Sequence, residues 1–276
     1  MAGRLEVVDA ALAPPVWPSL RNEAEHMAAS EPSLASLLNA VILRHSKLAD
    51  ALSYQLARKI GDQELRAMSL REIAEEAYGA EPSIVVDAEA DLRAVFERDP
   101  SCKGYVQPLL YFKGFLALQA HRVAHRLWRQ GREAMAFYLQ SRVSELFQVD
   151  IHPAAVIGKG AFLDHGTGIV IGETAVIGDD VSMLHGVTLG GTGAERGDRH
   201  PKIGSGVLLG AGAKVLGNIT VGDHAKIASG SVVLKPVPAH CTAAGVPARL
   251  INCPSCEEPA RTMDQTLGDS VYDYVI

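Results

Sequence analysis

The stretch that decides the fold is residues 203–235, IGSGVLLGAGAKVLGNITVGDHAKIASGSVVLK, in which an aliphatic residue returns at every sixth position. Glycine directly follows several of these residues, where a turn or a close backbone approach is expected. A helix would need apolar residues three or four apart, and glycine at this density would cost about 1 kcal/mol per residue relative to alanine. The pattern therefore favours a parallel β-helix of hexapeptide repeats.

The same period reaches back to residue 151 and falls into three registers that each advance by six. Three hexads make one triangular coil, and neighbouring coils stack about 4.8 Å apart. We expect roughly four coils whose interior is filled by the aliphatic series, so that a substrate must bind outside it. The series is Ile151, Ile157, Leu163, Ile169; Ile171, Ile177, Met183, Leu189; and Ile203, Leu209, Val215, Val221, Ile227, Val233.

The period breaks in two places, and both breaks are rich in polar residues and glycine. The first is a two-residue slip between Ile169 and Ile171, just after residues 163–168 (LDHGTG). The second is the excursion of residues 190–202 (GGTGAERGDRHPK), which is too polar to form another coil. A loop can leave a solenoid without disturbing its core, so we expect the functional site at these breaks.

The rest of the chain indicates two domains and a tail, in an α+β fold. At 276 residues and 47% hydrophobic, the chain can bury a sizeable core. Residues 1–145 have few glycines and apolar residues at helical spacing, which predicts an α-helical domain that includes one long helix over residues 106–130. Residues 146–251 form the left-handed β-helix with its protruding loop. Residues 252–276 are polar and are expected to form a flexible C-terminal tail.

Charge and composition limit the partners. A net charge of −6 and a pI near 5.9 argue against nucleic acid. No apolar run is long enough to span a membrane, and the first residues lack the core of a signal peptide. We therefore expect a cytoplasmic enzyme.

The cysteines do not form a recognisable disulfide framework. The chain has Cys102, Cys241, Cys253 and Cys256, and the last two form a single CxxC pair in the polar tail. One such pair without a second is weak evidence for zinc or redox chemistry, so we assign it no role.

Two histidines of the predicted long helix, His121 and His125, stand four residues apart and would share one helix face. Such a pair can bind a metal, but Arg122, Arg126 and Arg129 lie beside it, and clustered cations repel a metal ion. A solvated or intersubunit face is expected instead, and no metal site is predicted.

His165 is the candidate general base, because it lies between Asp164 and Gly166 at the first break of the period. Asp150 precedes it by fifteen residues, close to one coil, so the two side chains could meet if the offset falls at a corner. In an Asp–His pair the carboxylate fixes the imidazole tautomer and stabilises the imidazolium that forms when the ring removes a proton from a hydroxyl. Hydrogen bonding of both groups to backbone atoms at a corner is the equally weighted alternative.

Several motifs resemble the serine O-acetyltransferase family of cysteine biosynthesis. The resemblance covers most of the chain and includes the helical domain, which separates this family from the sugar and lipid acyltransferases that share only the hexads. The motifs are residues 98–100 (RDP), 111–115 (YFKGF), 147–153 (FQVDIHP), 163–168 (LDHGTG), 187–193 (VTLGGTG), 197–202 (GDRHPK) and 243–249 (AAGVPAR).

The resemblance implies acetyl transfer from acetyl-CoA to the hydroxyl of L-serine. Carried over by motif, His165 is the base and Asp150 its orienting partner, while Asp99, Asp164, Arg199 and His200 hold serine. These residue types suit a zwitterion, since Arg199 can pair with its carboxylate and the two aspartates with its ammonium. L-cysteine, which differs from serine by one atom, is implied as a feedback inhibitor in the same pocket.

Acetyl-CoA is expected as a co-substrate, with no permanently bound cofactor, along the outside of the coils between neighbouring subunits. The residues predicted to line it are Gly191, Thr192, Ala211, Gly212 and Lys226, the last as a phosphate contact. No cysteine lies in the motifs to carry an acyl group, so we expect direct transfer in a ternary complex.

The resemblance also implies a hexamer, formed as a dimer of trimers, and binding of O-acetylserine sulfhydrylase through the C-terminal Ile276. Three alternatives stay open. The acceptor could be homoserine or a sugar. The β-helix could carry a zinc hydrolyase site, with His165, His185 and His200 forming the metal site between subunits. The chain could also be a scaffold, in which case replacing His165 would leave its function intact.

Overall fold

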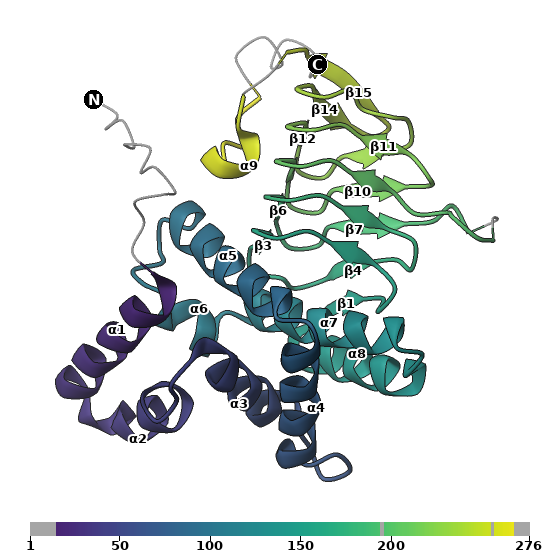
Figure 1. Ribbon diagram of the computed structural model, residues 1–276. Helices are drawn as coiled ribbons and strands as arrows, with labels where there is room; N and C mark the ends of the chain where they lie inside the picture. The colour runs from purple at the N-terminus through teal and green to yellow at the C-terminus, as the bar shows by residue number, and fades with distance from the viewer. Residues whose placement is uncertain (1–14, 194–195, 255–256, 268–276) are drawn as a thin grey trace, which may run out of the picture.

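The computed structural model describes residues 15–193, 196–254 and 257–267, and in these the helices come first and the strands follow (Figure 1). α7 and α8 lie against the first strand of the solenoid, at the end opposite the last strands. The helical segments before the solenoid are α1 (Val16–Ser30), η1 (Pro32–Leu34), α2 (Ala35–Leu38), η2 (Asn39–Leu43), α3 (Leu48–Ile60), α4 (Ala67–Ala80), α5 (Ser83–Arg98), α6 (Val106–Tyr111), α7 (Lys113–Arg129) and α8 (Glu133–Phe147).

The strands form three sheets that wrap into the predicted left-handed β-helix, and all pairs are parallel except the last, β14 with β15. One sheet has the order β1-β4-β7-β10-β13, with β1 (Val149–Ile151), β4 (Ile169–Ile171), β7 (Thr188–Gly190), β10 (Lys214–Leu216) and β13 (Val232–Val233). The second has the order β11-β8-β5-β2, with β11 (Thr220–Val221), β8 (Lys202–Ile203), β5 (Val176–Ile177) and β2 (Val156–Ile157). The third has the order β15-β14-β12-β9-β6-β3, with β15 (Ala248–Asn252), β14 (Thr242–Gly245), β12 (Lys226–Ile227), β9 (Leu208–Leu209), β6 (Ser182–Met183) and β3 (Phe162–Leu163).

The hexad positions form the interior of the solenoid, as predicted. All the aliphatic residues of the three registers are buried, from Ile151 to Val233. Both breaks of the period lie at corners. The slip lengthens the first coil, so that Val149 pairs with Ile169 of the next coil. The polar excursion lies between β7 and β8. The core is therefore packed with side chains, and a ligand can bind only on the outside.

The helix expected over residues 106–130 is wrong in one respect, because it is two helices. α6 ends at Tyr111, Phe112 has an extended backbone with φ −85° and ψ 109°, and α7 starts at Lys113. The break lets the first turn of α7 approach the solenoid backbone closely. A Cβ on Gly114 would lie only 2.0 Å from the carbonyl oxygen of Leu163.

A buried ion pair joins the helices to the first coil. Asp91 of α5 is fully buried, and its carboxylate accepts hydrogen bonds from Arg122 of α7 and from the Ala161 amide. The Arg122 guanidinium also donates to the carbonyl oxygens of Ile157 and Gly158. Burial raises the pKa of Asp91, and the Arg122 cation opposes that shift. Helices and coil thus share polar contacts that water cannot replace.

The face with His121 and His125 is only partly solvated within one chain, because His121 is buried, His125 and Arg126 are half-buried and Arg129 is exposed. His121 is 5% exposed, and His125 Nδ1 bonds the Pro153 carbonyl at 2.8 Å. Burial lowers the pKa of both histidines. The neighbouring arginines are paired with carboxylates, such as Arg126 with Glu81 at 3.5 Å, and an intersubunit role of this face stays a prediction.

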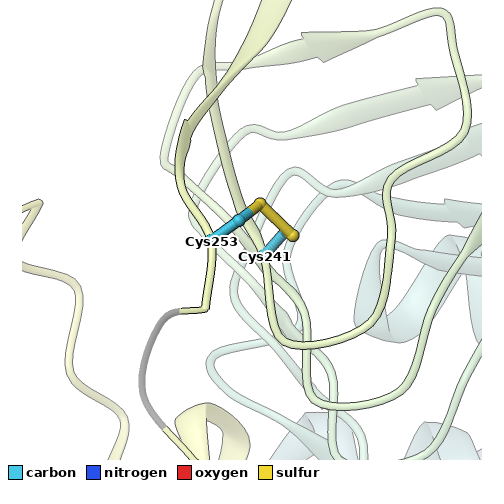
Figure 2. Close-up of a disulfide and its surroundings, with 2 residues drawn as sticks. All are labelled: Cys241 and Cys253. Carbon is cyan, nitrogen blue, oxygen red and sulfur yellow. A yellow bond between two sulfur atoms is a disulfide. The ribbon is translucent and has the colours of Figure 1, made fainter.

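The expectation that the cysteines form no disulfide is also wrong. Cys241 and Cys253 are bonded, at the open end of the antiparallel hairpin of β14 and β15 (Figure 2). Thr242, next to Cys241, pairs with Asn252, next to Cys253, so the hairpin brings the two sulfurs together. Cys102 is free and buried, and Cys256 lies outside the described residues.

After the hairpin the chain turns back along the third sheet as the short helix α9 (Pro259–Thr262), which packs against α5 and β9 (Figure 1). The Ala260 carbonyl accepts a hydrogen bond from the Ser182 hydroxyl at 2.8 Å. The tail residues up to 267 therefore have defined contacts. No helix within the described ranges is long and apolar enough to cross a bilayer.

Candidate active site

A cavity of about 330 Å³ opens where the helices meet the solenoid corner between β3 and β4. Both predicted acidic serine ligands, Asp99 and Asp164, line it together with His165. Asp99 follows α5, and the other two follow β3. The other lining residues are Ser101, Tyr111, Phe112, Lys113, Gly114, Phe162 and Leu163.

His165 projects from the corner with its side chain 72% exposed. Its φ of +58° is unusual for a residue with a Cβ and turns the chain sharply at the end of β3. Its Nε2 lies 3.7 Å from Asp164 Oδ1, and the ring of His185 meets it edge-on with 5.9 Å between centroids. The imidazole is therefore open to a ligand in the cavity and flanked by groups that can orient it.

Asp164 is half-buried in the cavity wall. Burial raises the pKa of its carboxyl; the nearby His165 ring opposes this shift, and the carboxylate of Asp99 adds to it. Two acids facing one cavity favour a cationic ligand, because an ammonium group would relieve their repulsion.

Arg199 and His200 lie at a different corner, next to β5 and the loop after β4. Arg199 Nη2 donates to Glu173 Oε2 at 2.7 Å. This hydrogen bond lowers the pKa of Glu173. Both backbone amides, of Arg199 and His200, donate to the Thr174 hydroxyl at 3.0 and 3.1 Å. Thr174 thus fixes the two predicted carboxylate ligands side by side.

His200 is 7% exposed, and its tautomer follows from its contacts. The Thr174 amide donates to His200 Nδ1 at 3.1 Å, so this nitrogen is an acceptor and Nε2 carries the proton. Burial lowers the pKa of His200, and the Arg199 cation lowers it further. A Cβ on Gly172 would lie 2.1 Å from the ring, so only glycine leaves room for it.

Asp150 does not contact His165 within one chain. Because the first coil is two residues longer than a standard coil, Asp150 of β1 stacks on Val170 rather than on the corner. Gln140 Nε2 donates to its carboxylate at 2.6 Å. The predicted site residues therefore fall into two groups on one protomer, which we call half-sites. The first contains Asp99, Asp164 and His165. The second contains Arg199 and His200, and Asp150 is assigned to it because Asp150 and Arg199 both lie close enough to His152 to affect its pKa.

A column of glycines with positive φ runs along the corner that carries His165. Gly168, Gly186, Gly212 and Gly230 stack on one another, and a Cβ on Gly186 would lie 3.4 Å from the Cα of Gly212. The predicted acetyl-CoA residues Ala211 and Gly212 lie in this column, one coil beyond His185, whose carbonyl accepts from the Gly212 amide. The column leaves a strip of backbone without side chains that a long, thin ligand could follow.

The other predicted acetyl-CoA residues lie apart from this column. Gly191 is beside Arg199, and Thr192 is beside Gly217, in the loop after β7. Lys226 of β12 is 5% exposed, and its ammonium donates to the carbonyls of Asp264 and Thr266 at 3.0 and 2.6 Å. In this structure the tail therefore covers the predicted phosphate contact. The predicted partner-binding Ile276 lies outside the described residues.

Sequence analysis missed two residues of these half-sites and gave a third the wrong context. Lys113 lines the cavity, and Glu173 holds Arg199. His185 was considered only as a ligand of an intersubunit zinc site with His165 and His200, whereas within one chain its ring meets that of His165 edge-on. The signal for His185 was its position twenty residues after His165, which is one long coil.

Comparison with known proteins decides the family. The serine acetyltransferase of Salmonella typhimurium is 57% identical over 250 residues, which are 91% of this chain and 92% of that protein. The chain belongs to the serine acetyltransferase family. The family model for the N-terminal region of serine acetyltransferase matches residues 16–120, and the bacterial transferase hexapeptide model matches residues 200–235. The predicted family and the predicted enzyme class, an acyltransferase, are confirmed.

Solved serine acetyltransferase structures share the fold over nearly their whole length. One in complex with cysteine superposes with a TM-score of 0.89 at 55% identity, covering 91% of this chain and 98% of that one. The serine acetyltransferase of Brucella abortus in complex with coenzyme A gives a TM-score of 0.86 at 51% identity, covering 90% of this chain and all of that one.

Proposed function

We propose that this chain transfers the acetyl group of acetyl-CoA to the hydroxyl of L-serine, giving O-acetyl-L-serine and CoA, as the first step of cysteine biosynthesis from serine. The observation that carries the proposal is the cavity in which His165 faces the carboxylates of Asp99 and Asp164. A hydroxyl acceptor needs a base, and an amino-acid acceptor needs anions for its ammonium. The cavity supplies both within a family of serine acetyltransferases.

The chemistry is direct transfer in a ternary complex. His165 removes the proton from the serine hydroxyl while its oxygen attacks the thioester carbonyl of acetyl-CoA. The tetrahedral intermediate then collapses, the C–S bond breaks, and the imidazolium returns the proton to the CoA sulfur. Free Cys102 is buried and outside the cavity lining, so it is not placed to accept the acetyl group.

Serine is held at both ends in this proposal. Its ammonium pairs with Asp99 and Asp164, and its carboxylate meets Arg199 and the Nε2 proton of His200. L-cysteine would make the same contacts with a thiol in place of the hydroxyl, which supports feedback inhibition at this site. The relative solved in complex with cysteine is consistent with such binding.

The two half-sites come together between neighbouring protomers. The sheet of β1, β4, β7, β10 and β13 separates the His165 corner from the Arg199 corner of one chain. Three protomers with this sheet towards a common axis would place the His165 corner of each against the Arg199 corner of the next. In that arrangement Asp150 can orient the His165 ring of a neighbour. Two such trimers would form the proposed hexamer through the helices.

Acetyl-CoA would follow the glycine column past Ala211 and Gly212, opposite Gly191 and Thr192 of the neighbouring protomer. For Lys226 to bind a phosphate, the carbonyls of Asp264 and Thr266 must first leave its ammonium. We further propose a cytoplasmic location and binding of O-acetylserine sulfhydrylase by Ile276.

The test is release of CoA thiol from acetyl-CoA with L-serine, L-homoserine or a galactoside as separate acceptors. We expect release with L-serine and a loss of about 100-fold or more in His165→Ala. His26→Ala, at an exposed histidine of α1, is the matched control and should keep full activity. Faster CoA release with another acceptor would identify that acceptor as the substrate. Equal CoA release in wild type and His165→Ala would refute the assignment of His165 as the base.

The shared site is tested by mixing two inactive variants, His165→Ala and Arg199→Ala, during refolding or co-expression. If each site takes His165 from one protomer and Arg199 from the next, random mixing regenerates an intact pair at roughly a quarter of the sites. Activity near that fraction is expected. No recovery in mixed oligomers of verified composition would contradict the intersubunit site.

A further inference from the structure

The first turn of α7 carries two residues that a helix start disfavours. Lys113 is the first residue of α7, where its charge opposes the positive end of the helix dipole. Gly114 follows it and has the poorest helix propensity apart from proline. The turn has no acidic residue and no side-chain cap that would compensate. Residues that disfavour a helix start indicate that a contact outside the helix requires them.

That contact is with the corner loop 164–168, which carries His165. Gly114 lies against the carbonyl of Leu163, where any Cβ would clash, so glycine is needed for the helix to reach the loop. The Lys113 ammonium donates to the Thr167 hydroxyl at 2.5 Å. Both residues therefore contact the loop from the same side.

The rest of the loop is held only by backbone hydrogen bonds. Gly168 donates to the Gln148 carbonyl at 2.7 Å, and the Thr167 carbonyl accepts from Gly186 at 2.8 Å. Gly166 donates to Asp164 within the loop. The His165 side chain is 72% exposed, and its ring neighbours are Asp164 at 3.7 Å and the edge of His185, so the aim of the ring depends on the position of the loop backbone. The contact from Lys113 to Thr167 is the one side-chain hydrogen bond that ties this loop to α7 among the described residues.

We propose that Lys113 is a positioning residue for His165. Its ammonium holds Thr167 and, through it, the loop that aims the imidazole at the acceptor. Lys113 also lines the cavity that contains Asp99, Asp164 and His165. This inference rests on the proposed acetyl transfer, because the loop has a task only if His165 is the base.

The test compares kcat and KM for L-serine in Lys113→Met, Lys113→Arg, Thr167→Val and the double variant Lys113→Met/Thr167→Val. Displacing a general base by about 1 Å can cost on the order of 100-fold, so we expect kcat to fall about tenfold to 100-fold in Lys113→Met with KM changed by less than about threefold. Thr167→Val should show a similar split. The double variant should be no worse than the more damaged single variant, since both break one contact. Lys113→Arg, which keeps the charge and a donor, should recover most of the lost kcat.

Lys159→Met is the matched control, because Lys159 is an exposed lysine at another solenoid corner. If Lys113→Met does not fold, Thr167→Val and Lys113→Arg carry the same comparison. Unchanged kcat, a rise confined to KM, or additive losses in the double variant would each overturn the positioning role. Wild-type activity separates the two hypotheses. A wild type without serine-dependent CoA release refutes the proposed function, whereas an active wild type with a fully active Lys113→Met refutes only this inference.

Discussion

Removing the disulfide between Cys241 and Cys253 should loosen the last hairpin of the solenoid. The bond spans a sequence separation of 12 residues, and closing a loop of this size lowers the entropy of the open chain by an amount worth about 3 kcal/mol. The residues of β15 are exposed or half-buried, so β15 has little apolar packing to replace that contribution. We therefore expect the double variant Cys241→Ser/Cys253→Ser to open β15 locally.

The effect should be confined to the end of the solenoid and the tail that follows it. Hydrogen exchange followed by mass spectrometry reports the opening of each peptide. If the full 3 kcal/mol acts on this opening, protection in residues 248–252 should fall by roughly 100-fold. Residues 259–267 should also lose protection, because their docking on Lys226 and Ser182 starts from the end of β15. Peptides of α3 and α7 should not change.

Cys256→Ser is the matched control, since it removes a neighbouring thiol and leaves both bonded sulfurs in place. The wild type treated with a reductant should behave like the double variant. Equal protection of β15 in oxidised wild type and double variant would refute the view that the bond, rather than strand pairing, holds this hairpin.

Three further outcomes follow from buried contacts. Gly172→Ala should displace the His200 ring, because the added Cβ would overlap it. We expect KM for L-serine to rise about tenfold or more, the range of a lost hydrogen bond to a charged group, and kcat to change less. An unchanged KM would show that His200 does not belong to the serine site. Asp91→Asn should lower the free energy of unfolding by about 3–5 kcal/mol, measured by denaturant titration, because it leaves the Arg122 charge buried without its partner; a loss below 1 kcal/mol would contradict this. His121, whose pKa is lowered by burial, stays neutral in the folded protein but is protonated in the unfolded chain below about pH 6.5. Stability should thus fall as pH drops below that value, by at most about 1.4 kcal/mol per pH unit from this histidine, and His121→Gln should flatten the melting profile between pH 6.5 and 5.

The solenoid could be predicted from sequence because each hexad reports directly on burial. Ile157, Leu163 and the later members of the series sit inside for the same reason that they recur, and glycine marks the turns between them. A cavity also lies at the first predicted break of the period, where Asp164 and His165 line it; its role as the acceptor site stays a prediction. Local periodicity was sufficient for these features.

Other features depend on contacts that no local pattern encodes. The break at Phe112 exists because α7 must approach Leu163, some fifty residues later in the chain. Cys241 meets Cys253 only through the pairing of β14 with β15. The expected contact of Asp150 with His165 assumed a standard coil, and the two extra residues of the first coil shift that register.

Several polar contacts between the helices and the first coil are made to backbone atoms of the solenoid. Asp91 accepts from the Ala161 amide, Arg122 donates to the carbonyls of Ile157 and Gly158, and Arg98 donates to the carbonyl of Gly160. Any hexapeptide coil of the same shape offers these amides and carbonyls whatever its side chains are. These backbone contacts would survive sequence drift in the coil, whereas the bonds of Arg98 to Asp180 and of Lys113 to Thr167 tie the helices to particular side chains. Both kinds of contact keep Asp99, just beyond the end of α5, at the wall of the cavity.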